Sequence, residues 1–199
     1  MARPKDKEEI IIFAAISVFK DKGFTNTTIQ DIADAAGLAK GTMYDYFKSK
    51  DDLFIQALKF QAKHIDENML DAIMSKSGFI NKLNLMLDFT MKKEAANHSI
   101  IMKAFFLNDS TGLKPETKRE FHNFMEEMRE KAIRIWADII EQGVIEGIIR
   151  SSDVEFSAAC IFNLIMVYHQ LLDAKKEDDT NFKSKMLDFI LNGVGYHEV

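Results

Sequence analysis

The residues best suited to binding chemistry lie in one short segment, residues 40–46, which reads Lys-Gly-Thr-Met-Tyr-Asp-Tyr. At about 100° of rotation per residue in an α-helix, Met43 points one way and the other side chains point outward or to the flanks. A helix face that offers a glycine and a hydroxyl can approach the major groove of DNA closely. Lysine and tyrosine at the edges of such a face suit phosphate oxygens. The outward face carries Gly41, Thr42 and Asp45, flanked by Lys40, Tyr44 and Tyr46.

Two neighbouring parts of the chain add groups that suit phosphate. Lys48 and Lys50 continue the basic edge. Thr27 and Thr28 stand at the amino end of the preceding helix, where hydroxyl groups and unpaired backbone amides bind phosphate. The residues expected to contact DNA are therefore Thr27, Thr28, Lys40, Gly41, Thr42, Tyr44, Asp45, Tyr46 and Lys50.

Two short helices joined by a tight turn must position these residues. Thr28 and Asp31 form a capping-box pattern that opens a helix over residues 29–36, and Gly37 ends it. A second helix follows over residues 40–47. The inward positions are small or apolar: Ile29, Ile32, Ala33, Ala36, Leu38, Met43 and Phe47. This spacing predicts a helix-turn-helix, and the alternative is an ordinary helical corner packed on a core.

Many residues in the first quarter of the chain agree in register with one protein family. These residues are Ile11, Ala14, Ala15, Phe19, Gly23, Thr27, Thr28, Asp31, Ile32, Ala33, Ala36, Gly37, Lys40, Gly41, Thr42, Tyr44, Tyr46, Phe47, Lys50 and Leu53. On this pattern the chain resembles the TetR family of transcriptional regulators. The resemblance implies an all-α fold with two domains. The first is a three-helix DNA-binding domain over residues 1–50, and the second is a helical ligand-binding and dimerisation domain over residues 51–199.

Two residues depart from the family pattern. Ala39 stands where the family usually has serine, so the second helix lacks a side-chain cap, which typically costs about 1 kcal/mol. Asp45 places an acid on the outward face, where an acid is unusual. Its carboxylate can accept a hydrogen bond from the N4 amine of cytosine, or it can repel phosphate, and both interpretations stay open.

The rest of the chain is also predicted to be helical. Apolar residues recur at helical spacing, and the whole chain holds only 2 prolines. A first helix is expected over about residues 5–22. After the helix-turn-helix, helices are expected over about residues 50–74, 79–95, 100–107, 115–143, 154–173 and 181–191.

Charge and cysteine content exclude several classes of protein. The net charge of −5 argues against a protein that coats nucleic acid without specificity. Residues 1–50 hold eight Lys and Arg against seven Asp and Glu, so only this part tolerates a polyanion. A single cysteine, Cys160, excludes a disulfide framework and fits a reducing cytoplasm, and we expect its thiol to be buried.

The apolar run at residues 10–19 does not indicate a secretion signal. Acidic residues precede it, and no small-residue cleavage site follows it. We expect a cytoplasmic protein. The histidines are too scattered for a metal site, and no catalytic motif occurs, so we expect no metal, no cofactor and no enzyme activity.

The second domain is rich in adaptable apolar residues. Beyond Phe54 it holds eleven further Phe and nine Met, which suit an apolar effector cavity between helices, although each one alone also fits a plain core. Two histidines could orient a polar end of the effector, or they could be core residues. The predicted effector residues are Phe60, His64, Met86, Phe89, Met102, Phe105, Phe106, Phe124, Met128, Phe162, Met166 and His169.

The last two helices carry more than one apolar stripe each, which indicates two packing partners. We expect one partner to be the chain's own core and the other to be the same helix pair on a second chain, and the alternative is a monomer. The residues predicted at this dimer interface are Ser157, Ala158, Ile161, Ile165, Tyr168, Phe182, Met186, Phe189 and Ile190.

Together these features predict a ligand-responsive transcriptional regulator. It would bind a palindromic operator as a homodimer, and a small hydrophobic effector would release it. The alternatives are a helical small-molecule carrier or adaptor without DNA activity, and an enzyme that uses scattered carboxylates. The basic residues Arg3, Lys5 and Lys7 either enter a minor groove or form a disordered tail.

Overall fold

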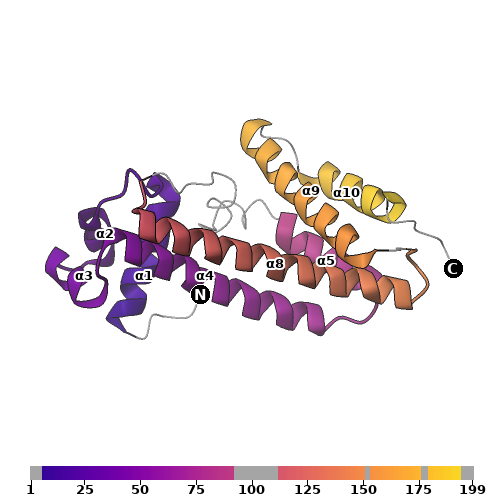
Figure 1. Ribbon diagram of the computed structural model, residues 1–199, viewed down its shortest axis with the longest axis horizontal. Coiled ribbons are helices and arrows are strands. Elements are labelled where there is room, and N and C mark those ends of the chain that lie inside the picture. The colour runs from indigo at the N-terminus through magenta and orange to yellow at the C-terminus, as the bar shows by residue number, and fades with distance from the viewer. Residues whose placement is uncertain (1–5, 92–111, 151–152, 176–178, 194–199) are drawn as a thin grey trace. The chain divides into compact units, whose positions relative to one another are not determined.

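The computed structural model describes residues 6–91, 112–150, 153–175 and 179–193 (Figure 1). These residues form helices and connecting turns, with no extended β-strand among them, which confirms the all-α fold. The helices are α1 (Lys7–Lys22), α2 (Ile29–Ala36), α3 (Lys40–Tyr46), α4 (Lys50–Met74), α5 (Phe79–Met91), α8 (Pro115–Ile145), α9 (Val154–Lys175) and α10 (Asp179–Gly193).

The helix boundaries follow the sequence prediction closely. Within the described residues several ends differ by two residues: α8 continues to Ile145 instead of ending near Gly143, α9 continues to Lys175, and α10 is two residues longer at each end. Gly147, with a φ of 73°, supplies the left-handed residue that follows α8. The helix predicted over residues 100–107 lies outside the described residues.

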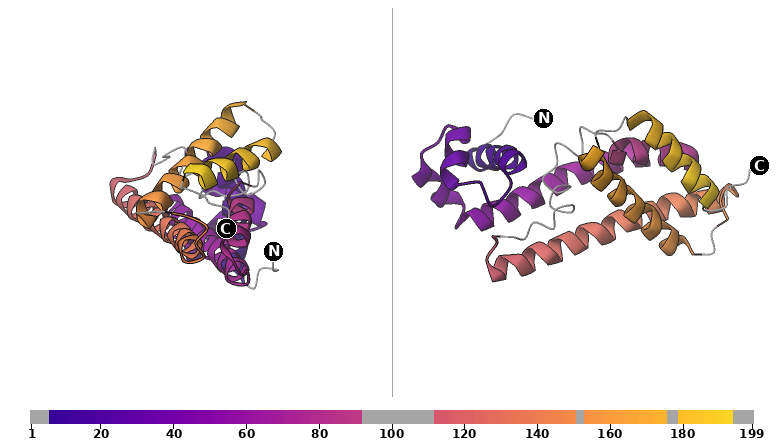
Figure 2. Two further views of the ribbon diagram at one scale, coloured as in Figure 1. Left: turned by 90° about the vertical axis from the view of Figure 1, so that its right-hand side faces the viewer. Right: turned by 90° about the horizontal axis from the view of Figure 1, so that it is seen from above.

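The chain divides into two compact units, with boundaries inside α4 and α8. The first unit comprises residues 1–66 and 97–125, and the second comprises residues 67–96 and 126–199. The compact unit around the helix-turn-helix is therefore larger than the domain predicted over residues 1–50. In this unit α1, α2 and α3 gather beside the first turns of α4 (Figure 2).

Aromatic rings form the core of the first unit. The ring of Phe54 on α4 lies with its centroid 5.0 Å from those of both Phe19 and Phe24, and 6.2 Å from that of Phe121 on α8. All four side chains are buried. Burial of a side chain of this size stabilises a fold by roughly 1.5–3 kcal/mol, so this cluster fixes α1 and α4 together.

The second unit is built around a close approach of α5 to α8. A Cβ atom on Gly143 would lie 2.8 Å from Cδ2 of Phe79 and 2.9 Å from Cδ1 of Ile149, so only glycine fits there without rearrangement. Glu146 accepts hydrogen bonds from the backbone N–H of Phe79, with N···O distances of 3.0 and 3.2 Å, and so caps α5. Helix α5 in turn contacts α9 and α10.

Within the described parts of the chain, no helix combines the length and the apolar character that crossing a bilayer requires.

Candidate nucleic-acid interface

The helix-turn-helix is held by local hydrogen bonds at both ends of α2. The hydroxyl of Thr28 accepts from the N–H of Asp31 at 3.1 Å, and the carboxylate of Asp31 accepts from the N–H of Thr28 at 2.8 Å. This confirms the predicted capping box. At the other end Gly37 adopts the left-handed conformation, with φ 68° and ψ 32°, and the N–H of Leu38 donates to the carbonyl of Ala33 at 3.0 Å.

Asp31 also ties α2 to α1. The ammonium of Lys22, in the last turn of α1, lies 2.6 Å from a carboxylate oxygen of Asp31. This ion pair, together with the hydrogen bonds from Thr28, holds the pKa of Asp31 well below its usual range. Asp31 is therefore ionised at neutral pH and keeps both contacts.

Helix α3 presents the face that its periodicity predicts. Met43 is 1% exposed and points into the core, and Phe47, immediately after the helix, is also buried. On the outer side Tyr44 is 53% and Tyr46 is 43% exposed. The other predicted DNA-contacting residues of this helix are solvent-accessible as well: Lys40, Gly41 and Asp45 are exposed and Thr42 is half-buried.

The missing cap of α3 is also present in the structure. Ala39 occupies the N-cap position, and no side chain caps the helix there. The first turn is closed by the backbone alone, through a 3.0 Å hydrogen bond from the N–H of Thr42 to the carbonyl of Ala39.

Two residues predicted to face DNA are instead engaged inside the protein. Thr27 is 2% exposed, and its hydroxyl donates to the carbonyl of Gly23 at 2.6 Å. The ammonium of Lys50 donates to the carbonyls of Phe24 and Thr27 at 2.8 and 2.9 Å. It also lies 4.2 Å from the ring centroid of Phe24. Both side chains stabilise the turn between α1 and α2.

Burial lowers the pKa of Lys50 from its usual value, and the neighbouring charge of Asp51 opposes that shift. The ammonium of Lys50 is therefore a partly buried cation whose hydrogen bonds hold the turn together. Thr28, by contrast, is exposed at the amino end of α2, as predicted, although its hydroxyl also donates to Asp31 at 2.7 Å.

The predicted effector residues are placed differently from one another. Met86, Phe124 and Phe162 are buried, and Phe60, Phe89, Met128 and Met166 are half-buried. Met102, Phe105 and Phe106 lie outside the described residues, as does the side chain of His169. His64 is exposed on α4 and is not a core histidine. Its ring lies 4.2 Å from that of Phe60, and its Nδ1 lies 2.9 Å from the carbonyl oxygen of Phe60.

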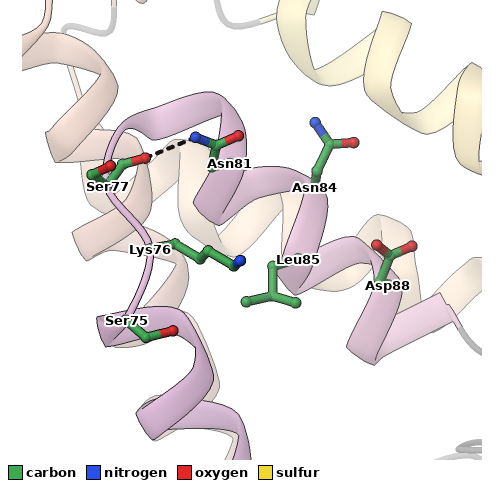
Figure 3. Close-up of a pocket in the computed structure, with 7 residues that line it drawn as sticks. All are labelled: Ser75, Lys76, Ser77, Asn81, Asn84, Leu85 and Asp88. Carbon is green, nitrogen blue, oxygen red and sulfur yellow. Dashed lines mark hydrogen bonds between the residues drawn. The ribbon is translucent and has the colours of Figure 1, made fainter.

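A hollow of about 520 Å³ lies between the end of α4 and the outer side of α5 (Figure 3). It contains none of the predicted effector residues. Its lining is mainly polar: Ser75, Lys76, Ser77, Asn81, Asn84, Leu85 and Asp88. Among the described residues no group of three or more His, Cys, Asp or Glu side chains is arranged to hold a metal ion.

The surface of α9 and α10 differs from the predicted dimer interface. Six of the predicted residues have side chains buried within the single chain: Ala158, Ile161, Ile165, Tyr168, Met186 and Ile190. Ser157 is half-buried, and its hydroxyl donates to the carbonyl of Asp153. Phe189 is 58% exposed. The side chain of Phe182 lies outside the described part of the chain. Periodicity shows two apolar stripes on a helix but does not tell which one faces the core.

A different stripe of α9 is exposed. Phe156 is 67% and Val167 is 48% exposed, and Cys160 and Asn163 between them are exposed as well. Their spacing of four, three and four residues places them on one side of the helix. The expectation of a buried Cys160 is therefore wrong, because the thiol lies on this outer stripe.

Known proteins resemble this chain over most of its length. Residues 11–57 match the family model described as bacterial regulatory proteins, tetR family. The chain is 26% identical to the fatty acid metabolism regulator protein of Bacillus subtilis (strain 168) over 198 residues, covering 98% of each chain. It is 28% identical to the HTH-type transcriptional repressor KstR2 of Rhodococcus jostii over 158 residues, covering 76% of this chain and 72% of the repressor.

A solved structure shows the same fold. The transcriptional regulator FadR from Bacillus subtilis, in complex with stearoyl-CoA, matches with a TM-score of 0.76 and 25% sequence identity, over 94% of this chain and 98% of that chain.

The two glycines of the helix-turn-helix are expected to respond differently to alanine. Gly37→Ala should destabilise the protein by about 1–2 kcal/mol, because a side chain is strained in the left-handed conformation. Gly41→Ala should stabilise it by up to about 1 kcal/mol, because no atom outside its own stretch of helix backbone lies within 4 Å of the added Cβ and alanine favours helix. Thermal unfolding measures both effects.

The same Gly41→Ala variant should bind DNA more weakly than the wild type, because its methyl group would stand on the face that the sequence predicts to approach the groove. Unchanged DNA affinity in a filter-binding or anisotropy titration would show that α3 does not approach bases at this point.

Proposed function

We propose that the chain is a ligand-responsive transcriptional regulator of the TetR family, and that it acts as a dimeric repressor which long-chain acyl-coenzyme A releases from a palindromic operator. The observation that carries the DNA-binding part is the outer face of α3. Two exposed tyrosines lie there beside an exposed glycine and a threonine. The capped helix α2 and the buried side chains of Met43 and Phe47 hold α3 in place.

We assign the contacts of α3 by their chemistry. Gly41 and Thr42 face the base edges, because they allow close approach and offer one hydroxyl. Lys40, Tyr44 and Tyr46 face phosphate oxygens on the groove walls. In a homodimer the two copies of α3 would lie about 34–36 Å apart, one turn of DNA, which requires an operator with two-fold symmetry.

The effector class is proposed from the relatives and from the apolar content of this chain. The similar regulator from Bacillus subtilis is named for fatty acid metabolism, and its structure holds stearoyl-CoA. This chain holds 16 Phe and 11 Met, which suit a long, flexible acyl chain. As part of the same proposal, the protein acts in the cytoplasm. Release follows if the effector binds an arrangement that fits the operator poorly.

We place the dimer contact on the exposed stripe of α9 and its neighbour on α10. Phe156, Val167 and Phe189 are large apolar side chains that remain exposed in the single chain. The residues predicted earlier, such as Ile161 and Ile165, would support this stripe from beneath because they are buried in the chain's own core.

The two kinds of DNA contact predict different behaviour for two variants. Tyr46→Phe should weaken binding to all sequences alike, by roughly tenfold, because it removes one hydrogen bond to a charged phosphate. Thr42→Ala should instead change the preference among operator sequences, by about 1–3 kcal/mol at one base pair. Gel-shift titration against the DNA upstream of the chain's own gene, with single-base operator variants, measures both.

Lys63→Ala is the matched control for these variants, because this lysine is exposed on α4 and lies outside α3. If the variants of α3 bind the operator as the wild type does, the assignment of this helix is wrong.

Stearoyl-CoA should release the wild-type protein from its operator at micromolar concentration. Free coenzyme A and stearate should do so much less, because each lacks one of the two parts that the site would bind. Fluorescence anisotropy of a labelled operator follows the release. Equal effects of stearoyl-CoA and of free coenzyme A would exclude an acyl-chain site.

The protein should run as a dimer in size-exclusion chromatography with light scattering, and Phe156→Lys with Phe189→Lys should make it monomeric. A buried lysine that lacks a partner opposes association, because its charge would have to leave water. Ile145→Lys is the control, since Ile145 is an equally apolar, 75% exposed residue on α8. A dimer that persists in the double variant would remove α9 and α10 from the interface.

A further inference from the structure

The first turn of α4 joins two segments that are far apart in the sequence. Lys50 reaches back to the carbonyls of Phe24 and Thr27 in the turn between α1 and α2. Asp51, the next residue, accepts a hydrogen bond at 2.9 Å from the N–H of Lys114, immediately before α8. We call these five residues the α4 junction.

Asp51 is not needed to cap its own helix. Ser49 caps this helix, because its hydroxyl accepts from the N–H of Asp52 at 3.1 Å, and the carboxylate of Asp52 accepts in turn from the N–H of Lys48 at 2.9 Å. Asp51 is only 8% exposed, and burial of a carboxylate is costly unless its bonds compensate. Its partner lies 63 residues further along the chain, so its bond fixes tertiary structure.

The chain just before α8 also lies against the turn that Lys50 holds. A Cβ atom on Gly112 would lie 3.4 Å from the hydroxyl oxygen of Thr25 and 3.7 Å from the ring of Phe24. Leu113 is 5% exposed. The start of α8 and the turn before α2 therefore pack together, and the α4 junction bonds both of them to the first turn of α4.

The first turns of α8 are fixed to α4 as well. The ring of Phe121 stacks on that of Phe54, and the ammonium of Lys59 lies 2.8 Å from the carboxylate of Glu120. Any movement of the first turns of α8 against α4 would have to disturb these contacts together with the bond between Asp51 and Lys114.

We propose that Asp51 is a positioning residue that couples the start of α8 to the helix-turn-helix, so that effector binding in the helical domain changes operator affinity through this one bond. The proposal rests on the proposed function, since it assigns a route for the same effector response. The charge of Asp51 has a second effect, because it favours the charged form of Lys50 against the burial that lowers the pKa of that lysine.

Hydrogen exchange tests the coupling without DNA or effector. Asp51→Asn keeps the shape of the side chain but removes its charge, and a hydrogen bond to a charged group is roughly twice as strong as a neutral one. Amides in residues 112–118 and also in residues 24–32 should exchange at least about threefold faster in this variant. Asp52→Asn is the matched control, and it should affect only residues near Lys48.

Gly112→Ala provides a second variant in case Asp51→Asn folds poorly. It leaves Asp51 intact but adds a methyl group at a φ of 88°, next to Thr25. The same two peptides should exchange faster. If residues 24–32 are unchanged in both variants, or respond equally to Asp52→Asn, the coupling does not exist.

The functional test compares operator affinity with and without stearoyl-CoA. In the wild type the two dissociation constants should differ by roughly 5–150-fold, which is the range typical of allosteric coupling. In Asp51→Asn the ratio should fall to within about threefold of one, while Asp52→Asn keeps the wild-type ratio. A wild-type ratio in Asp51→Asn would overturn the proposal.

The two proposals fail in different ways. If stearoyl-CoA does not release even the wild-type protein, the assignment of the effector is wrong, and hydrogen exchange still decides whether Asp51 couples α8 to the helix-turn-helix.

Discussion

A helix of only seven residues, such as α3, cannot be stable by itself, and this constraint shapes the whole first unit. Nucleating a helix is costly, and isolated helices shorter than about 12–15 residues are marginal in water. Helix α3 has 7 residues and α2 has 8, and α3 also lacks a side-chain cap. Their conformation must therefore come from the parts around them.

The apolar contacts supply most of that support, and the polar contacts set the geometry. The buried side chains of Ile32, Met43 and Phe47 each stabilise the fold by roughly 1.5–3 kcal/mol. The exposed pair between Lys22 and Asp31 contributes little to stability, because solvent screens surface ion pairs. The bonds of Lys50 satisfy two backbone carbonyls of the turn between α1 and α2, and so fix the course of the chain into α2.

Features with local causes could be predicted from the sequence. The capping box at Thr28, the left-handed Gly37 and the buried Met43 depend on residues within a few positions, and the structure has all three. The sequence pattern places Lys50 at the DNA because this lysine continues a basic edge with Lys48. Its real partners lie 23 and 26 residues earlier in the chain, and no pattern in the sequence marks a carbonyl as an acceptor.

The same distinction explains α9, α10 and the effector residues. Their apolar spacing predicted helices correctly, but the choice of inner face depends on α5, which packs against both. Burial of Met86 and Phe162 agrees with an apolar interior, yet a residue that lines a cavity and a residue that fills a core have the same pattern in sequence. Composition did not predict the exposure of Cys160, because a small residue with apolar neighbours in sequence can still lie on the outer side of a helix.

The length of α4 turns small rearrangements into displacements that matter for DNA. Its 25 residues span about 37 Å at 1.5 Å per residue. If the helix tilts as a rigid rod by about 5° at its carboxyl end, its amino end moves by about 3 Å. A displacement of that size equals a hydrogen bond length, so it breaks contacts with phosphate oxygens that a recognition helix had made. Under the proposed function, a ligand would therefore need to change very little at one end of such a rod to alter the contacts made at the other end.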